Sequence, residues 1–293
     1  MGQNMNKFVI TTDSNSDLPK DYILKHNITI IPQYYGFDDE VYGDEKHLPP
    51  ADFYQKMRDG QMPTSMANNP AVIQSKFEAL LDEGYDILHI AFSSQLSGSY
   101  GNVVMVANEL KEERPDATIE VIDSCTASLG ETLLVIKAYE LKEEGKSLIE
   151  IRDIIESSKG NIYSDFTVDD LNHLQRGGRI SKTTALVGGI VKIKPVLTLD
   201  KEGKITSAGS ARGRKKAYSL LIDRISAKND GNYGTMPIGI MHGDCLDDAN
   251  YFAGLLRDKL GCSNIIINDI SPSIGTHAGP GVIGVCYWGN EPR

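Results

Sequence analysis

Four serines lie within Ser93–Tyr100, which reads Ser-Ser-Gln-Leu-Ser-Gly-Ser-Tyr. The segment follows the apolar run Ile87–Phe92, which predicts a strand, and it precedes a predicted helix. Hydroxyl and backbone N–H groups at such a turn can hold an anion, because a helix N-terminus favours negative charge. The simpler alternative is that one serine caps the helix. One cap does not require four serines, so this turn is a candidate anion site.

A second pair of hydroxyl groups, on Thr64 and Ser65, precedes a helix predicted to begin near Pro70. The two hydroxyl segments together could hold a carboxylate or a phosphate. Taken alone, Thr64 and Ser65 are better explained as a loop that caps the following helix.

Cations gather in the second half of a chain that is acidic overall. Arg179 follows two glycines and carries a planar guanidinium suited to a pair of anionic oxygens. Further along, Arg212, Arg214, Lys215 and Lys216 form a basic run. This run is either a solvated helix start or a patch for a phosphate or an acidic partner.

His277 lies in Ile274–Gly281, where three glycines surround it. Glycines at this density predict a close-fitting loop that presents the histidine to a site. One reading is a serine hydrolase in which Ser94 is the nucleophile, His277 the base and Asp123 the residue that orients the base. The chain lacks the G-x-S-x-G turn of many such enzymes, so the hydrolase is kept as the alternative.

The first half of the chain must position these residues through alternating strands and helices. That rhythm predicts parallel β-α-β units, in which ligands bind beyond the carboxyl ends of the strands. The predicted strands are Phe8–Thr11, Asn27–Pro32, Ile87–Phe92 and Thr118–Ile122, and the predicted helices are Ala71–Leu81, Val103–Leu110 and Leu129–Glu144.

The second half has consecutive strands with no helix between them. Ile190–Leu199 and Ile205–Ala208 flank a turn and predict a hairpin, which is typical of an α+β layer. We therefore expect an N-terminal parallel-sheet α/β domain over residues 1–160. We expect a C-terminal α+β domain with a mixed or antiparallel sheet over residues 161–293.

Length and charge restrict the classes of function. The 293 residues are enough for one large or two ordinary domains, and the formal net charge of −10 argues against a nucleic-acid partner. No apolar run approaches the roughly 20 residues that cross a bilayer, so we expect no stable membrane insertion. The polar N-terminus shows no signal peptide, and we expect a cytoplasmic protein. The scattered cysteines and histidines lack metal-ligand spacing, so we expect neither a metal nor a cofactor.

Taken in order, these segments resemble the DegV family of bacterial fatty-acid-binding proteins. The resemblance runs from about residue 7 to about residue 287. The matching segments are Thr12–Pro19, Pro63–Ser65, Ser93–Tyr100, Asp123–Ser124, Gly177–Ser181, Lys194–Leu197, Arg212–Lys216 and Gly275–Gly281.

The resemblance implies a two-domain protein that buries one long-chain fatty acid between its domains. It assigns the carboxylate to Thr64 and Ser94, with Ser65, Ser93 and Ser97 as neighbours whose roles stay open. One departure concerns the segment after Ser65, where the family usually has Gln-Pro-Ser and this chain has Met66–Pro70.

The resemblance also implies a partner. Family proteins hand the bound acid to a separate ATP-dependent kinase, which forms an acyl phosphate for phospholipid synthesis. Arg179, Arg212, Arg214 and His277 match positions at the head-group end or at the encounter with the kinase. On this reading the chain is a carrier subunit and not itself an enzyme.

Overall fold

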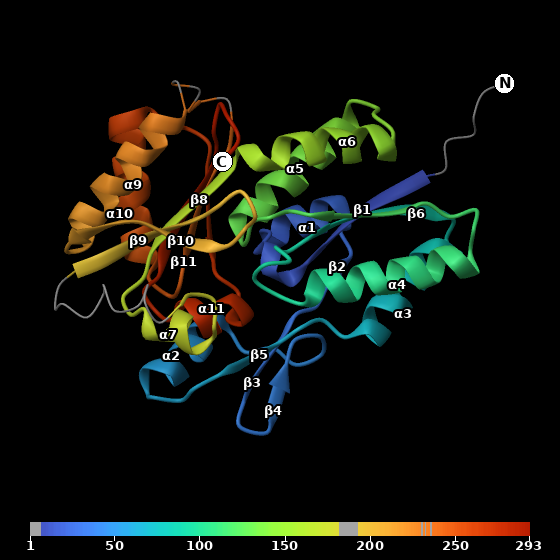
Figure 1. Cartoon of the computed structure of the whole chain (residues 1–293), viewed down its shortest axis with the longest axis horizontal. Coiled ribbons are helices and arrows are strands. Elements are labelled where there is room, and N and C mark those ends of the chain that lie inside the picture. The colour runs from blue at the N-terminus through green and yellow to red at the C-terminus, as the bar shows by residue number, and fades with distance from the viewer. Residues whose placement is uncertain (1–6, 182–192, 230, 232, 235) are drawn as a thin grey trace.

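Two β-sheets stand side by side with one helix, α5, between them (Figure 1). The structure is a computed structural model that describes residues 7–181, 193–229, 231, 233–234 and 236–293. The helix α5 (Leu129–Glu143) packs on strands of both sheets, and most of its residues are buried. It is therefore the central element of the molecule.

The first sheet is parallel, in the strand order β2-β1-β6-β7. Helices α3 and α4 cover one face, and α5 and α6 cover the other (Figure 1). The carboxyl ends of β1, β6 and β7 meet at one edge, as predicted. The bounds are β1 (Lys7–Asp13), β2 (Ile30–Ile31), β6 (Tyr85–Ala91), β7 (Ile119–Asp123), α3 (Pro70–Asp82), α4 (Ser99–Glu113) and α6 (Leu148–Ser158), with α1 (Lys20–His26) following the short turn η1 (Ser14–Ser16).

The second sheet is mixed, in the order β10-β9-β8-β13-β11-β12, and only β11 and β12 run parallel. Helices α9 and α10 cover the face opposite α5. The predicted hairpin is present, although residues 190–192 of its first strand lie outside the described residues. The bounds are β8 (Ile162–Thr167), β9 (Ile193–Leu199), β10 (Ile205–Arg212), β11 (Ile238–His242), β12 (Ile265–Asp269), β13 (Ile283–Trp288), α7 (Asn172–Arg176), α9 (Arg214–Lys228), α10 (Leu246–Leu260) and α11 (Pro272–Ala278).

A third, three-stranded sheet lies below the other two in Figure 1 and was not predicted. It packs on α2 (Pro50–Arg58) through an aromatic cluster that includes Tyr35 and Phe53. Its strands are β3 (Tyr34–Phe37), β4 (Glu40–Tyr42) and β5 (Thr64–Met66). The residues Thr64 and Ser65, predicted to lie in a loop, are therefore in a strand.

The α/β fold class is confirmed, with a parallel N-terminal sheet and a mixed C-terminal sheet. The loop predicted for Ile274–Gly281 is wrong in its first half, because His277 lies in helix α11. A helix can pass here because Gly275 has no Cβ, which would lie 2.5 Å from the Tyr54 hydroxyl. The boundary near residue 160 stays a prediction, since one hydrophobic core contains residues from both sides of it.

Candidate functional site

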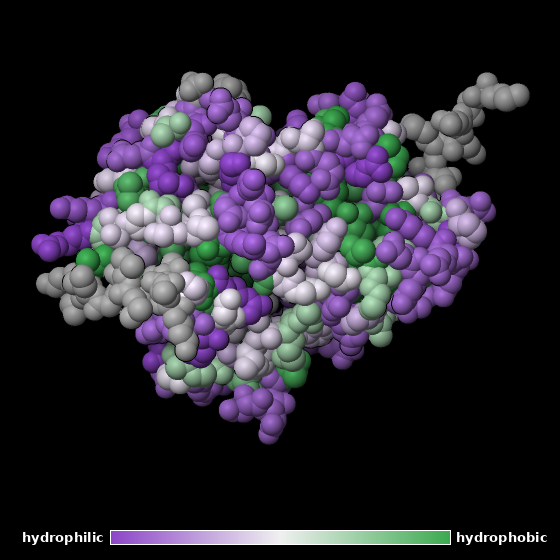
Figure 2. Space-filling view, viewed as in Figure 1, coloured by the Kyte–Doolittle hydropathy of each residue, from purple (hydrophilic) through white to green (hydrophobic). Residues whose placement is uncertain are grey.

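A largely apolar cavity of about 250 Å³ lies where both large sheets, α11 and β5 meet. Apolar side chains from distant parts of the chain form most of its wall, and polar side chains from several elements complete it. Figure 2 shows apolar residues in the depression between the two halves of the molecule. The apolar residues include Phe92, Leu96, Phe166, Leu199, Met241 and Ile274, and the polar ones include Gln33, Ser65, Ser97, Arg179 and His277.

The strand β5 places Ser65 and Thr64 on opposite faces, because side chains alternate along a strand. Ser65 is half-buried and lines the cavity, whereas Thr64 is exposed and lies outside the wall formed by the described residues. Pairing with β3, in which Ser65 lies opposite Tyr35, sets this register. Of these two described side chains, only Ser65 borders the cavity.

His277 reaches Ser65 from α11, and its Nε2 lies 2.7 Å from the Ser65 Oγ. Its Nδ1 is buried and has no hydrogen-bond partner among the described residues. Burial, together with the charges of Arg179 and Arg176, lowers the pKa of His277 to about 4. The imidazole is therefore neutral at physiological pH.

Arg179 lines the same part of the cavity and has no carboxylate partner among the residues the structure describes. Its Nε donates to the carbonyl of Leu96 at 2.9 Å, and its Nη1 donates to the carbonyl of Gly177. Burial lowers the pKa of this guanidinium, as expected when no anion compensates its desolvation. A half-buried cation without a counter-ion suits an anionic or strongly polar ligand.

The serine turn divides into two parts. Ser97 lines the cavity, and its Oγ lies 2.8 Å from that of Ser99. The Ser93 hydroxyl instead donates to the carbonyl of Gly203 at 3.1 Å. Neither Ser93 nor Ser94 belongs to the wall that the described residues form.

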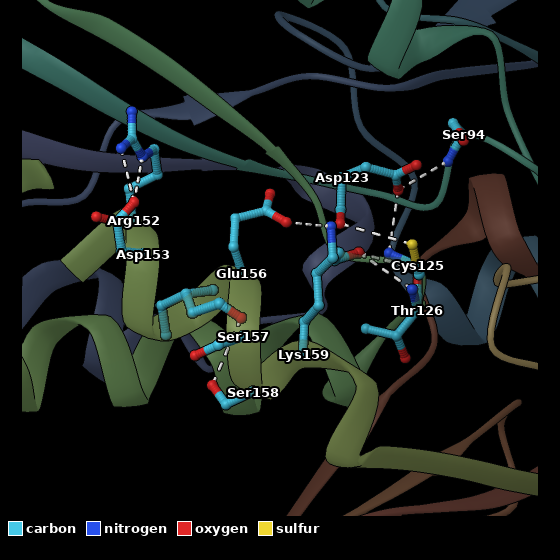
Figure 3. Close-up of polar contacts among 12 residues, drawn as sticks. Ser94, Asp123, Cys125, Thr126, Arg152, Asp153, Glu156, Ser157, Ser158 and Lys159 are labelled. Atoms are coloured by element: carbon cyan, nitrogen blue, oxygen red, sulfur yellow. Dashed lines mark hydrogen bonds and ion pairs between the residues drawn. The ribbon is translucent and has the colours of Figure 1, made fainter. Parts of the chain in front are cut away.

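The three residues of the alternative hydrolase do not meet. Figure 3 shows Ser94 beside Asp123, whose Oδ1 accepts hydrogen bonds from the backbone N–H groups of Ser94 and Cys125 at 3.1 and 3.0 Å. His277 bonds to Ser65 instead. Asp123 therefore shapes the turn and does not orient a histidine, so this predicted triad is wrong.

The basic run also lies apart from the cavity wall that is described. Arg214 forms ion pairs with Asp169 at 2.6 Å and with Asp248, and it donates to the carbonyl of Gly281 at 2.7 Å. The hydrogen bonds and charge of Asp169 raise the pKa of Arg214 despite its burial. Arg212 is exposed at the end of β10. Arg214 thus connects the start of α9 to Asp169, Asp248 and Gly281 and has a structural role, whereas Arg212 faces the surface.

Sequence reasoning missed the polar groups behind the cavity. Gln33, which follows β2, is 3% exposed and faces the cavity. Asp13 at the end of β1 is buried, and desolvation raises its pKa to about 6. Burial likewise raises the pKa of Asp17 to about 7 and that of Glu131, on α5, well above its ordinary value. The only sequence signal was the polar segment after the first predicted strand.

Neither a metal cluster nor a membrane helix is found in the part of the chain that the structure describes. No group of three or more His, Cys, Asp or Glu residues there could hold a metal ion. No helix there is long and apolar enough to cross a membrane.

The fold defines an α/β protein with a cavity between two sheets, and known proteins share this architecture. A family model described as an uncharacterised protein of the DegV family matches residues 7–290. A DegV domain-containing protein of Clostridium perfringens is 38% identical over 288 residues, which cover 98% of this chain and 99% of that protein.

Solved structures agree with this assignment. A DegV family protein from Thermus thermophilus, described for its fatty acid binding, has a TM-score of 0.83 and 29% identity, covering 97% of this chain and 99% of that one. A stearic acid-binding protein from Eubacterium ventriosum has a TM-score of 0.86 and 26% identity, with coverages of 95% and 97%. The chain belongs to the DegV family.

Proposed function

We propose that this protein binds one long-chain fatty acid in the cavity between its sheets. The observation that carries the proposal is the pairing of an apolar cavity with Arg179, a cation that lacks a counter-ion among the described residues. Each methylene buried against the apolar wall contributes roughly 0.8 kcal/mol, which favours a long acyl chain. The fatty-acid-binding relatives support the same ligand class.

The carboxyl group of the acid would lie among Ser65, Ser97, Arg179 and His277. The family resemblance assigns this group to Thr64 and Ser94 instead. The geometry favours Ser65 and Ser97, because these two hydroxyls line the cavity. The residues favoured by the geometry are close neighbours of those assigned by the resemblance. Ser65 follows Thr64 in β5, and Ser97 lies three residues after Ser94 in the serine turn.

The protein would act as a carrier subunit in the cytoplasm and present the acid to a separate ATP-dependent kinase. The acyl phosphate formed there would enter phospholipid synthesis. Exposed cations of the basic run, among them Arg212, Lys215 and Lys216, are candidates for contact with an acidic kinase surface. Arg214 is less suited to that contact because Asp169 and Asp248 already engage it.

Mass spectrometry of an organic extract of the purified protein tests the ligand class. We expect one fatty acid per chain, released only when the protein is denatured or extracted. A folded protein that is reproducibly empty, and that also fails to bind added palmitic or oleic acid, would exclude the carrier function.

Phosphoryl transfer from labelled ATP, catalysed by a fatty acid kinase subunit, tests the partner. The variant Arg212→Glu/Lys216→Glu should bind fatty acid normally and slow acyl-phosphate formation. The matched control Lys111→Glu changes a partly exposed cation on α4, away from the basic run. Equal rates for all three proteins would place the docking surface elsewhere.

A further inference from the structure

A chain of hydrogen bonds behind Ser97 fixes which way its hydroxyl points. The Ser99 hydroxyl donates to Oε1 of Gln33 at 2.6 Å, and the Ser97 Oγ lies 2.8 Å from the Ser99 Oγ. A serine hydroxyl carries one proton. Since Ser99 donates its proton to Gln33, Ser97 must be the donor in its bond with Ser99.

Ser97 therefore has no proton left for the cavity. Its oxygen accepts the backbone N–H of Ser99 at 3.2 Å and retains one lone pair. Ser97 lines the cavity, so this lone pair is available to a ligand. It requires a ligand group that donates a hydrogen bond.

Asp13 is a buried carboxyl close to Gln33. The Asp13 carboxyl accepts backbone N–H bonds from Asn15 and Phe92, both at 2.9 Å, and the Gln33 side chain further lowers its pKa against the effect of burial. The Gln33 Nε2 has no hydrogen-bond partner among the described residues, so the bond from Ser99 to Oε1 is what orients the amide. The Gln33 backbone N–H, which donates to the Ser14 hydroxyl at 2.9 Å, holds the residue in place.

The Ser65 hydroxyl has the opposite hydrogen-bonding role to that of Ser97. Nδ1 of His277 has no hydrogen-bond partner among the described residues, and it lies against Gly177. A proton on Nε2 avoids a buried N–H without an acceptor and allows the ring to donate to the Ser65 Oγ. The Ser65 hydroxyl proton is then available to the cavity. Ser65 therefore offers a hydrogen-bond donor to the cavity, and Ser97 offers an acceptor.

We propose that the site binds its fatty acid as the neutral carboxylic acid, whose carbonyl oxygen accepts from Ser65 and whose O–H donates to Ser97. The inference rests on the proposed function, since it takes a fatty acid as the ligand. Gln33 and Ser99 are then positioning residues that act through Ser97. A carboxylate has no donor to offer and would face the lone pair of Ser97.

The charged and titratable groups around this position act in opposite directions. Arg176, the last residue of α7, and Arg179 just after it favour the ionised acid, whereas Asp13 on β1 favours the protonated one. Two of the guanidinium nitrogens of Arg179 already donate to backbone carbonyls. His277 on α11 is neutral and contributes no charge.

Carbon-13 NMR of palmitic acid labelled at its carboxyl carbon reads the protonation state directly. A carboxyl group in water ionises at about pH 4. We expect the resonance of the bound acid to keep the position of the neutral acid at pH 7. A bound resonance at the carboxylate position at pH 7 overturns the proposal and leaves fatty-acid binding intact, whereas the lack of any bound resonance counts against the proposed function itself.

Two variants test the positioning chain. Ser99→Ala frees the Ser97 proton to donate to the ligand, so the bound acid should ionise at least one pH unit lower than in the wild type. Ser97→Ala removes the acceptor and should lower this pH as well, without altering the buried Ser99–Gln33 bond. Ser219→Ala, at an exposed serine on α9, should leave the titration unchanged. An unchanged titration in both site variants would overturn the assignment.

Discussion

Gly177 and His277 are in such close contact that a Cβ on Gly177 would lie 2.0 Å from the Nδ1 of His277. The glycine is the C-cap of α7, and the histidine belongs to α11, so the contact joins two helices at the cavity. On its other side the imidazole bonds to Ser65. The imidazole ring is therefore held between the backbone of Gly177 and the hydroxyl of Ser65, which borders the cavity.

Gly177→Ala should displace His277 and weaken fatty-acid binding about tenfold, equivalent to about 1.4 kcal/mol. The backbone of Gly177, with φ of −71°, accommodates alanine, so the clash with the ring is the main effect. Displacement of a fluorescent fatty acid measures the affinity. Gly254→Ala in α10 is the matched control, since no heavy atom lies within 4 Å of its added Cβ. Equal affinities in the two variants would contradict a positioning role for Gly177.

Ser65→Ala and Thr64→Ala compare two neighbouring hydroxyls of β5. Ser65 faces the cavity and Thr64 faces outward, so the Ser65 variant should lose about 0.5–1.5 kcal/mol of binding free energy, the usual value for a neutral hydrogen bond. The Thr64 variant should bind nearly as the wild type does. Titration calorimetry with a saturated fatty acid measures both. The opposite ranking would support the residue that the family resemblance assigns.

Glu131→Gln should stabilise the protein at alkaline pH. Burial raises the pKa of Glu131 in the folded state, so the wild type loses stability as pH rises above about 4.5, where the unfolded chain ionises and the folded chain does not. Glutamine does not ionise, and its oxygen can still accept the hydrogen bond from Thr12. The melting temperature should exceed that of the wild type at pH 8, and the gain should shrink at pH 4.

The control for this comparison is Glu140→Gln, an exposed position on the same helix. Each kcal/mol corresponds to about 2–4 °C in a chain of this size class. A gain for Glu131→Gln that is the same at pH 4 and pH 8 would mean that ionisation of this carboxyl is not its source.

Arg224→Met should destabilise the protein by about 3–5 kcal/mol, because it leaves a buried carboxylate without its counter-ion. Asp165 is fully buried, and Arg224 donates to its two oxygens at 3.0 and 2.9 Å. Urea denaturation measures the loss. Arg152→Met removes a surface ion pair with Glu120 and should cost at most about 1 kcal/mol. A comparable loss of unfolding free energy in the two variants would contradict the prediction that the ion pair to the buried Asp165 contributes more than the surface pair.

The long strands and helices could be predicted because their apolar patterns are local. The prediction Leu129–Glu144 differs by one residue from the observed α5. The strands β3, β4 and β5 were missed because each has three or four residues and gains its stability from pairing and from the aromatic cluster beneath it. A pattern of three residues carries little periodic signal.

The segments that line the cavity include those singled out from the sequence, but the residue of each segment that faces inward depends on strand register. Whether Thr64 or Ser65 faces inward is decided by the pairing of β5 with β3, which lies about 30 residues earlier in the chain. His277 and Arg179, which the sequence singled out, both line the cavity, and their role at the head group stays a prediction. Gln33 gave no signal, since its importance comes from a contact with Ser99 across 66 residues.

The position of α5 has a consequence for recombining relatives of this protein. The helix belongs to the first half of the sequence, yet its side chains fill the core beneath both sheets, and Gly239 of β11 lies directly against Leu129. A chimaera that joins residues 1–160 of one relative to the rest of another would therefore place its mismatches on α5 and not at the junction. Such a hybrid needs α5 residues chosen for the incoming sheet.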